Sequence, residues 1–158
     1  MDAGDDLNLI IREAFGNRRK PTTISDFLDR LTGFDIEEVQ RLSNIDWENL
    51  TPSSVQNFRD AYAFITPTMR LFIAPKLLIL ALDYPKLILG DNLVSYMCDD
   101  LSSRILRDGY DIVDSFSAAE KSAISAWQEC VTISLSEAED RASREISKIL
   151  RTIGSAVG

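Results

Sequence analysis

The feature that most constrains the fold is the apolar run from Phe64 to Leu82, FITPTMRLFIAPKLLILAL. From Met69 onward its apolar side chains cover every side of a helical wheel, and such a helix needs burial all round. Thr66 has a side-chain oxygen suited to an N-cap, and Pro67 suits the first helical position because its missing N–H is not needed there. The sequence therefore predicts a buried central helix over about residues 67–83.

Pro75 interrupts this run. It removes one backbone hydrogen bond and its ring collides with the carbonyl four residues earlier, so we expect the central helix to kink there. One interpretation is a kink that bends the helix around the core. The other is a ligand-binding notch, in which carbonyls freed by the kink lie beside charged side chains. The candidate binding notch comprises Tyr62, Arg70, Pro75 and Lys76, and the residues alone do not choose between the two interpretations.

Neither a membrane span nor a signal peptide is expected. A span needs about 20 apolar residues, whereas the central run carries Arg70 and Lys76 and stops at Asp83. The first residues, MDAGDDLNLII, are acidic where a signal peptide is basic, and they lack a long apolar region. The expected location is therefore the cytoplasm.

The amino-acid composition argues against several classes of partner and of catalytic site. The chain has 158 residues, enough for one domain (1–158) with a full core. With 25 acidic and 17 basic residues its net charge is −8, which argues against nucleic acid and anionic membranes as partners and favours a basic protein. There is no histidine, so the commonest general base and the commonest metal ligand are both missing.

Amphipathic stripes predict further helices around the central one. No run shows sustained strand alternation, so the expected fold is an all-α, single-domain bundle of about six to seven helices. The segment after Thr51-Pro52 is expected to run as one helix directly into the central helix. The other segments predicted to be helical are residues 5–15, a stretch beginning near Thr22 or Thr23 and ending at Gly33, 36–42, and 93–106 after a cap at Asp91 or Asn92.

A long helix is predicted at the C-terminal end. Ser117 and Glu120 form a capping box, and Phe116 before it is expected to enter the core. Apolar residues then step by three or four positions as far as Ile153, which predicts a helix over about 118–153, either continuous or with one kink, and roughly 50 Å long if straight. The alternative is a break near residues 132–136, which are rich in β-branched and serine residues.

The distal part of this predicted helix, residues 137–158, is expected to protrude from the domain. Its apolar stripe either packs back on the domain or contacts a partner helix, which would make the protein a homodimer. The residues of this candidate helix interface are Ala138, Ala142, Ile146, Ile149 and Ile153.

Acidic residues cluster in the second half of the chain and form a candidate partner surface: Asp99, Asp100, Asp108, Asp111 and Asp114. Their order does not match a calcium loop and no Glu-x-x-His pair is present, so neither a metal site nor a cofactor is predicted.

A nucleophilic catalytic site is not predicted either. Serines are frequent, but no histidine is present to activate them and no G-x-S-x-G elbow occurs. Cys98 and Cys130 are expected to be buried free thiols. No catalytic residue is predicted.

Three groups of residues resemble an uncharacterised family of small bacterial proteins: Asp46-Trp47 with Leu50, the stretch from Phe64 to Leu78 with Arg70 and Pro75 in one helix, and Phe116-Ser117 with Glu120, Ala123 and Ile124. The resemblance covers roughly residues 36–127. This sequence departs from the family pattern at residues 71–74, where members of the family usually have aromatic residues. It also departs in its predicted C-terminal helix, which is rich in serine and charged residues. It implies an all-α fold and a bacterial cytoplasmic origin; the family has no established activity, so it implies no functional residue.

Two kinds of function are compatible with these observations. The first is a non-enzymatic acidic protein-interaction domain, of which a toxin-neutralising immunity protein is the most specific version. The alternatives are a small-molecule- or metal-dependent activity at the kinked central helix and a self-associating scaffold.

Overall fold

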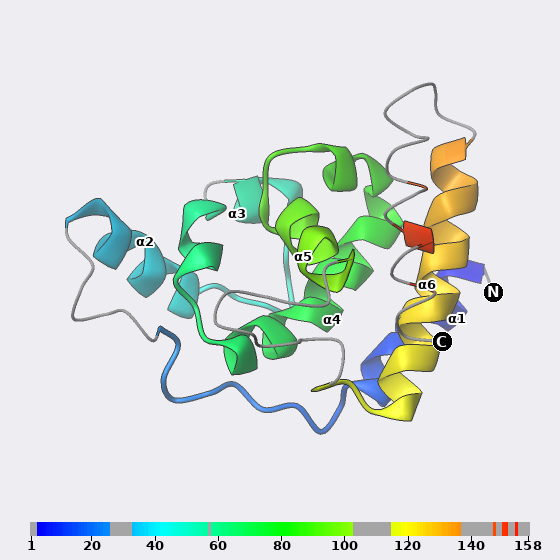
Figure 1. Ribbon diagram of the computed structural model, residues 1–158, viewed down its shortest axis with the longest axis horizontal. Coiled ribbons are helices and arrows are strands. Elements are labelled where there is room, and N and C mark those ends of the chain that lie inside the picture. The colour runs from blue at the N-terminus through cyan, green and yellow to red at the C-terminus, as the bar shows by residue number, and fades with distance from the viewer. Residues whose placement is uncertain are drawn as a thin grey trace.

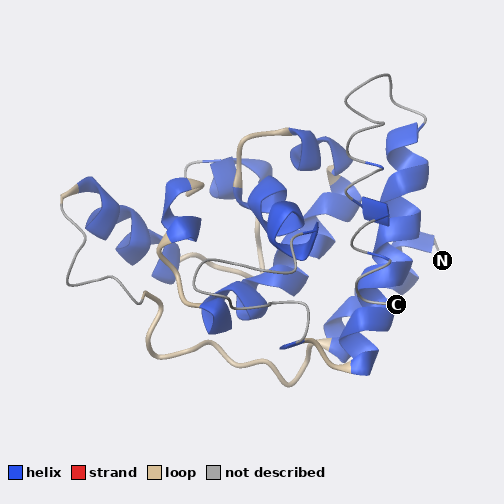
Figure 2. Ribbon diagram, in the orientation of Figure 1, coloured by secondary structure: helices blue, strands red, loops and turns tan. Residues whose placement is uncertain are grey.

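The structure is a computed structural model that describes residues 3–25, 33–56, 58–102 and 115–136, together with 147, 150, 151 and 154. The regular structure in these ranges is helical, as Figure 2 shows, and confirms the predicted all-α fold. An isolated antiparallel bridge joins Ser25 to Ile65. In chain order the elements are α1 (Ala3–Ala14), α2 (Phe34–Ser43), α3 (Pro52–Gln56), the 3₁₀ helix η1 (Asp60–Ala63), α4 (Pro67–Asp83), the 3₁₀ helix η2 (Pro85–Leu89), α5 (Leu93–Ser102) and α6 (Ala118–Ser136).

Helix α4 passes through the middle of the molecule (Figure 1). It starts as predicted: Pro67 is its first residue, and the hydroxyl of Thr66 accepts a hydrogen bond from the Met69 amide at 3.1 Å. Pro75 lies inside the helix and is buried. The buried residues of α4 face several directions, as expected for a helix that is apolar all round: Met69, Leu71, Ile73, Ala74, Pro75, Leu77, Leu78, Leu80 and Ala81.

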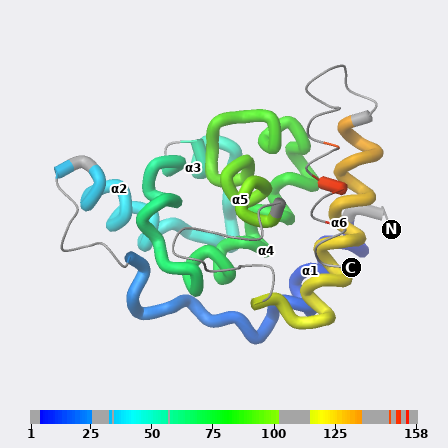
Figure 3. Tube along the Cα trace, in the orientation of Figure 1, coloured from blue at the N-terminus to red at the C-terminus, as the bar shows by residue number. Residues whose placement is uncertain are grey.

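Helices α1 and α6 lie side by side and cover one side of α4 (Figures 1 and 3). The indole N–H of Trp127 in α6 donates to the carbonyl of Leu78 in α4 at 2.9 Å, which satisfies the one polar atom of a fully buried side chain. The aromatic rings of Phe15 and Phe116 meet edge to face, with their centroids 5.9 Å apart. The predicted entry of Phe116 into the core is therefore confirmed.

Two predicted helices are corrected by the structure. Residues 21–25 are not helical: the carbonyl of Ile24 accepts from the Thr66 amide, and the hydroxyl of Ser25 donates to the carbonyl of Phe64. These contacts between distant residues hold the segment extended, while 26–32 lie outside the described ranges. The helix expected to run from Thr51-Pro52 directly into the central helix is instead two short elements, α3 and the 3₁₀ helix η1. The chain changes direction at this 3₁₀ turn before α4 begins.

The capping box at the start of α6 is confirmed in both directions. The Ser117 hydroxyl accepts from the Glu120 amide at 3.2 Å, and the Glu120 carboxylate accepts from the Ser117 amide at 2.7 Å. Among the described residues, no helix combines the length and the apolarity that crossing a bilayer requires.

Of the forms considered for the helix over 118–153, a single straight helix does not fit the described residues. Gly154 lies so close to Gln128 of α6 that a side chain at 154 would overlap the glutamine amide. In one straight helix these residues would be about 39 Å apart, at about 1.5 Å per residue. Leu150 is also fully buried in the core, which does not fit an end that protrudes. The five residues of the candidate helix interface, Ala138, Ala142, Ile146, Ile149 and Ile153, lie outside the described ranges, so the dimer contact stays a prediction.

Candidate functional site

The four residues of the predicted notch line two separate pockets of α4. Arg70 and Lys76 are six positions apart, which places them about 120° apart around the helix axis at 3.6 residues per turn. Tyr62 and Arg70 line one pocket, whereas Pro75 and Lys76 line the other, and the two pockets share no residue. In the described part of the chain, these two pockets therefore divide the four side chains into two pairs.

The first pocket, which we call the Tyr62 pocket, has a volume of about 470 Å³. It lies where α2, η1, α4 and α5 meet, so four segments that are distant in sequence contribute to its walls. Its lining residues are Asp35, Arg59, Asp60, Tyr62, Ala63, Phe64, Arg70, Tyr96 and Asp100.

A buried polar cluster forms the floor of the Tyr62 pocket. The Arg70 guanidinium lies 4.8 Å from the centre of the Tyr62 ring and 3.2 Å from the Asp100 carboxylate. Burial raises the pKa of Tyr62, and its hydrogen bond to the Asp100 carboxylate adds to the effect. Burial also raises the pKa of Asp100, which the contacts with Tyr62 and Arg70 oppose. The Nε atom of Arg70 is buried and lacks a hydrogen-bond partner among the described residues.

Carboxylates surround the mouth of this pocket. Arg59 pairs with Asp91 and lies 3.4 Å from Asp60, and the hydroxyl of Tyr96 donates to Asp91 at 3.2 Å. Tyr96 in turn stacks on Tyr62, with ring centroids 6.2 Å apart. Asp35 of α2 completes the rim. The rim therefore combines two lining carboxylates and one guanidinium above an aromatic floor, and Asp91 pairs with that guanidinium.

Glu38 of α2 is buried close to this rim, with a relative exposure of 1%. Burial is the main cause that raises its pKa, and the negative charge of Asp60 is the next. Asp35 also raises it, while Arg41 and a hydrogen bond from the Ala61 backbone lower it. Its Oε2 atom has no hydrogen-bond partner in the described part of the chain. The acidic groups on this side of the molecule therefore repel one another.

The predicted acidic partner surface is only partly placed by the structure. Asp99 is exposed on α5, but Asp100 is buried against Arg70 and is not available on the surface. Asp108, Asp111 and Asp114 lie outside the described residues. Sequence reasoning missed the rim of the Tyr62 pocket because its carboxylates come from α2, η1 and the residues before α5, and no local pattern joins them.

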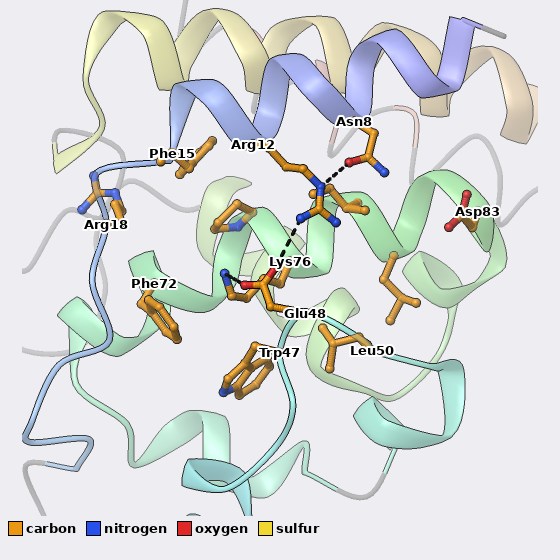
Figure 4. Close-up of a pocket in the computed structure, with 14 residues that line it drawn as sticks. Asn8, Arg12, Phe15, Arg18, Trp47, Glu48, Leu50, Phe72, Lys76 and Asp83 are labelled. Atoms are coloured by element: carbon orange, nitrogen blue, oxygen red, sulfur yellow. Dashed lines mark hydrogen bonds and ion pairs between the residues drawn. The ribbon is translucent and has the colours of Figure 1, made fainter. Parts of the chain in front are cut away.

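The second pocket, which we call the α1–α4 cleft, has a volume of about 400 Å³ and is shown in Figure 4. One wall is α1 with the residues that follow it, another is α4, and the connector before α3 closes the side between them. The lining residues are Asn8, Arg12, Phe15, Gly16, Arg18, Trp47, Glu48, Leu50, Phe72, Pro75, Lys76, Ile79, Leu80 and Asp83.

Glu48 is the centre of the polar contacts in this cleft (Figure 4). Its carboxylate accepts from Arg12 and from Lys76, each at 3.2 Å. The two cations lower the pKa of Glu48, with the hydrogen bond from Lys76 the largest cause. Arg12 also donates to Asn8 at 2.7 Å, and the Lys76 ammonium lies 4.8 Å from the centre of the Phe72 ring. Lys76 is thus held between an aromatic face and a carboxylate.

The described residues contain no group of three or more potential metal ligands arranged around one point. Cys98 and Cys130 are free thiols; Cys98 is buried as predicted, and Cys130 is partly exposed. Burial raises the pKa of Cys98, so its thiol stays protonated at neutral pH and is a poor nucleophile. Charged and aromatic side chains are prominent in the lining of both pockets.

Comparison with known proteins adds no family. No family model matches the chain, and neither a curated protein nor a solved structure does. The resemblance to a bacterial family seen in the sequence therefore stays a prediction, and the function rests on the geometry of the two pockets.

Proposed function

We propose that this protein is a non-enzymatic interaction domain that binds a basic segment of a partner protein at the Tyr62 pocket. The observation that carries the proposal is the pair of rim carboxylates, Asp35 and Asp60, around an aromatic floor, with Asp91 next to them at Arg59. Arg59 offsets only one of these three negative charges. Arg70 and Asp100 offset each other below them, so the mouth keeps a negative charge.

Repulsion within this acidic region favours a cation from outside. The negative charges of Asp60 and Asp35 both raise the pKa of the buried Glu38. A lysine or arginine of a partner would lower this repulsion on binding. Tyr96 is only partly buried, and the ring face that does not stack on Tyr62 offers a cation–π contact to an arginine.

The most specific form of this proposal is an immunity protein that neutralises a basic toxin. The net charge of −8 supports it, because an acidic surface accelerates association with a basic partner through long-range attraction. Such attraction weakens as salt rises, since the screening length falls to about 8 Å at physiological ionic strength.

The test compares two double variants with the same net charge. Asp35→Asn/Asp60→Asn alters the rim, whereas Asp5→Asn/Asp6→Asn removes two exposed charges of α1, far from the pocket lining. Each is used as bait for the source lysate at low and high salt, and retained proteins are identified by mass spectrometry. We expect a basic protein to be retained at low salt by the wild type and by the α1 variant, and to be lost by the rim variant.

If both variants retained the basic protein equally, its binding would depend only on the net charge of the bait. That result would contradict a binding site at the Tyr62 pocket. Retention of no basic protein by any bait would contradict the interaction proposal as a whole. Where a toxin co-purifies, co-expression in the source organism's relatives or in a laboratory host measures neutralisation directly, with the rim variant as the non-protecting control.

A further inference from the structure

The α1–α4 cleft directs two cationic side chains at one carboxylate. Arg12 and Lys76 each lie 3.2 Å from an oxygen of Glu48. Arg18 also lines the cleft, but it makes hydrogen bonds of 2.6 and 2.8 Å to Glu120 and is already paired. Two positive charges against one negative charge leave this part of the cleft positive, although the whole chain carries −8.

Of the three charged side chains in this contact, that of Glu48 is the most exposed. The Lys76 side chain is only 18% exposed and contacts the Phe72 ring, and Arg12 is fixed by Asn8. The Glu48 side chain is 64% exposed and belongs to the connector before α3. An external carboxylate can therefore exchange with Glu48 at the two cations while α1 and α4 stay where they are.

An apolar wall lies next to this charged end. Trp47, Leu50, Phe72, Pro75 and Ile79 line the cleft beside Lys76, and its volume of about 400 Å³ is in the range of small-molecule sites. Asp83 lies toward the other end of α4 in Figure 4, so its negative charge disfavours an anionic group there. The cleft thus orients a ligand with its anionic group toward Arg12 and Lys76.

We propose that the α1–α4 cleft binds a small amphipathic carboxylate, whose carboxylate replaces that of Glu48 at Lys76 and Arg12 and whose apolar part lies against Trp47, Leu50 and Phe72. Glu48 then acts as an internal competitor that occupies the anion position when the ligand is absent. This site shares no residue with the Tyr62 pocket and does not depend on the proposed protein partner.

Three probes with one apolar part and different head groups test this proposal: 4-phenylbutyrate, 4-phenylbutanol and 4-phenylbutylamine, each titrated into the full chain by calorimetry. We expect 4-phenylbutyrate to bind more tightly than the alcohol and the amine.

Glu48→Gln removes the competing carboxylate and should tighten the binding of 4-phenylbutyrate about threefold or more, as expected for an exposed ion pair. Lys76→Met removes the charge but keeps an unbranched apolar side chain beside Phe72, and it should weaken binding about tenfold. Lys86→Met, on an exposed lysine outside the cleft, should change nothing.

Equal affinity for the alcohol would show a purely apolar cleft and overturn the proposal, as would tighter binding of the amine. Unchanged affinity in Glu48→Gln would show that the ligand carboxylate does not take the place of Glu48, and absence of binding to both wild type and Glu48→Gln would overturn the site. Arg12→Gln serves as a second variant should Lys76→Met alter the fold, because Arg12 is half-exposed and its loss should weaken 4-phenylbutyrate alone.

Discussion

Glu38 is a glutamate whose structural environment works against its charge. The side chain is buried, one carboxylate oxygen lacks a partner among the described residues, and Asp60 and Asp35 add repulsion. All of these effects disfavour the ionised form, and burial is the largest. Glu38 therefore lies in an environment that favours its protonated form, next to two residues that line the Tyr62 pocket, Asp35 and Asp60.

The pKa of Glu38 predicts a specific pH dependence. It is raised above its ordinary value of 4.5, so above that pH the folded protein binds more protons than the unfolded chain, and stability falls as pH rises. Glu38→Gln removes this loss and should raise the free energy of unfolding at pH 7 by about 1 kcal/mol. At pH 4 the gain should vanish. Urea denaturation at both pH values measures this difference.

Glu37→Gln is the matched control, because Glu37 is the exposed neighbour of Glu38 on α2. It should change stability little at either pH. An equal gain from Glu38→Gln at pH 4 and pH 7 would mean that the effect comes from packing and not from titration.

At the scale of elements, one glutamate joins the ends of two helices. Glu120 caps α6 through the Ser117 amide, and its two oxygens also accept from Arg18, which follows α1. Arg18 donates to the Ser115 carbonyl at 2.9 Å and lies over the Phe116 ring. The end of α1 and the start of α6 are therefore fastened together by one bidentate ion pair.

Arg18→Ala should lower the free energy of unfolding by about 2–3 kcal/mol, because it leaves a largely buried carboxylate without its cation. Arg18→Lys should recover only part of this loss, since an ammonium cannot donate to both oxygens in the fork geometry of a guanidinium. Urea denaturation of both variants measures the effect. Arg19→Ala, on the exposed neighbour, is the control, and a loss no larger than in this control would contradict the role of the pair.

At the scale of the whole molecule, residues near the C-terminus pack against the rest of the domain. Leu150 is fully buried, and Gly154 packs against Gln128 of α6. Leu150 therefore belongs to the core, and residue 154 lies against α6. The α1–α6 side of the molecule thus depends on residues close to the end of the sequence.

Leu150→Ala should destabilise the protein by about 2–5 kcal/mol, the range for a truncated side chain in a packed core. Arg151→Ala removes an exposed neighbour and should have little effect. Thermal unfolding of the two variants gives the comparison. If Leu150→Ala were as mild as Arg151→Ala, the end of the chain would protrude, as the sequence alone suggested.

The sequence by itself determined the features whose signals lie within a few residues. The apolar composition of α4, its start at Thr66 and Pro67, and the capping box of Ser117 and Glu120 were all predicted, because a cap and its amide are three positions apart. The all-helical fold follows from such local signals together with the spacing of apolar residues.

Only the tertiary structure decided which charged side chains meet. Arg70 pairs with Asp100, thirty positions away in the sequence, and Glu48 pairs with Arg12 of α1 and Lys76 of α4. No local spacing of residues could reveal either contact. The same holds for the extended segment at Ser25 and for the return of the chain at Gly154. Local hydrogen bonding and side-chain periodicity specify helices, whereas the pockets between helices depend on packing among residues that the sequence keeps far apart.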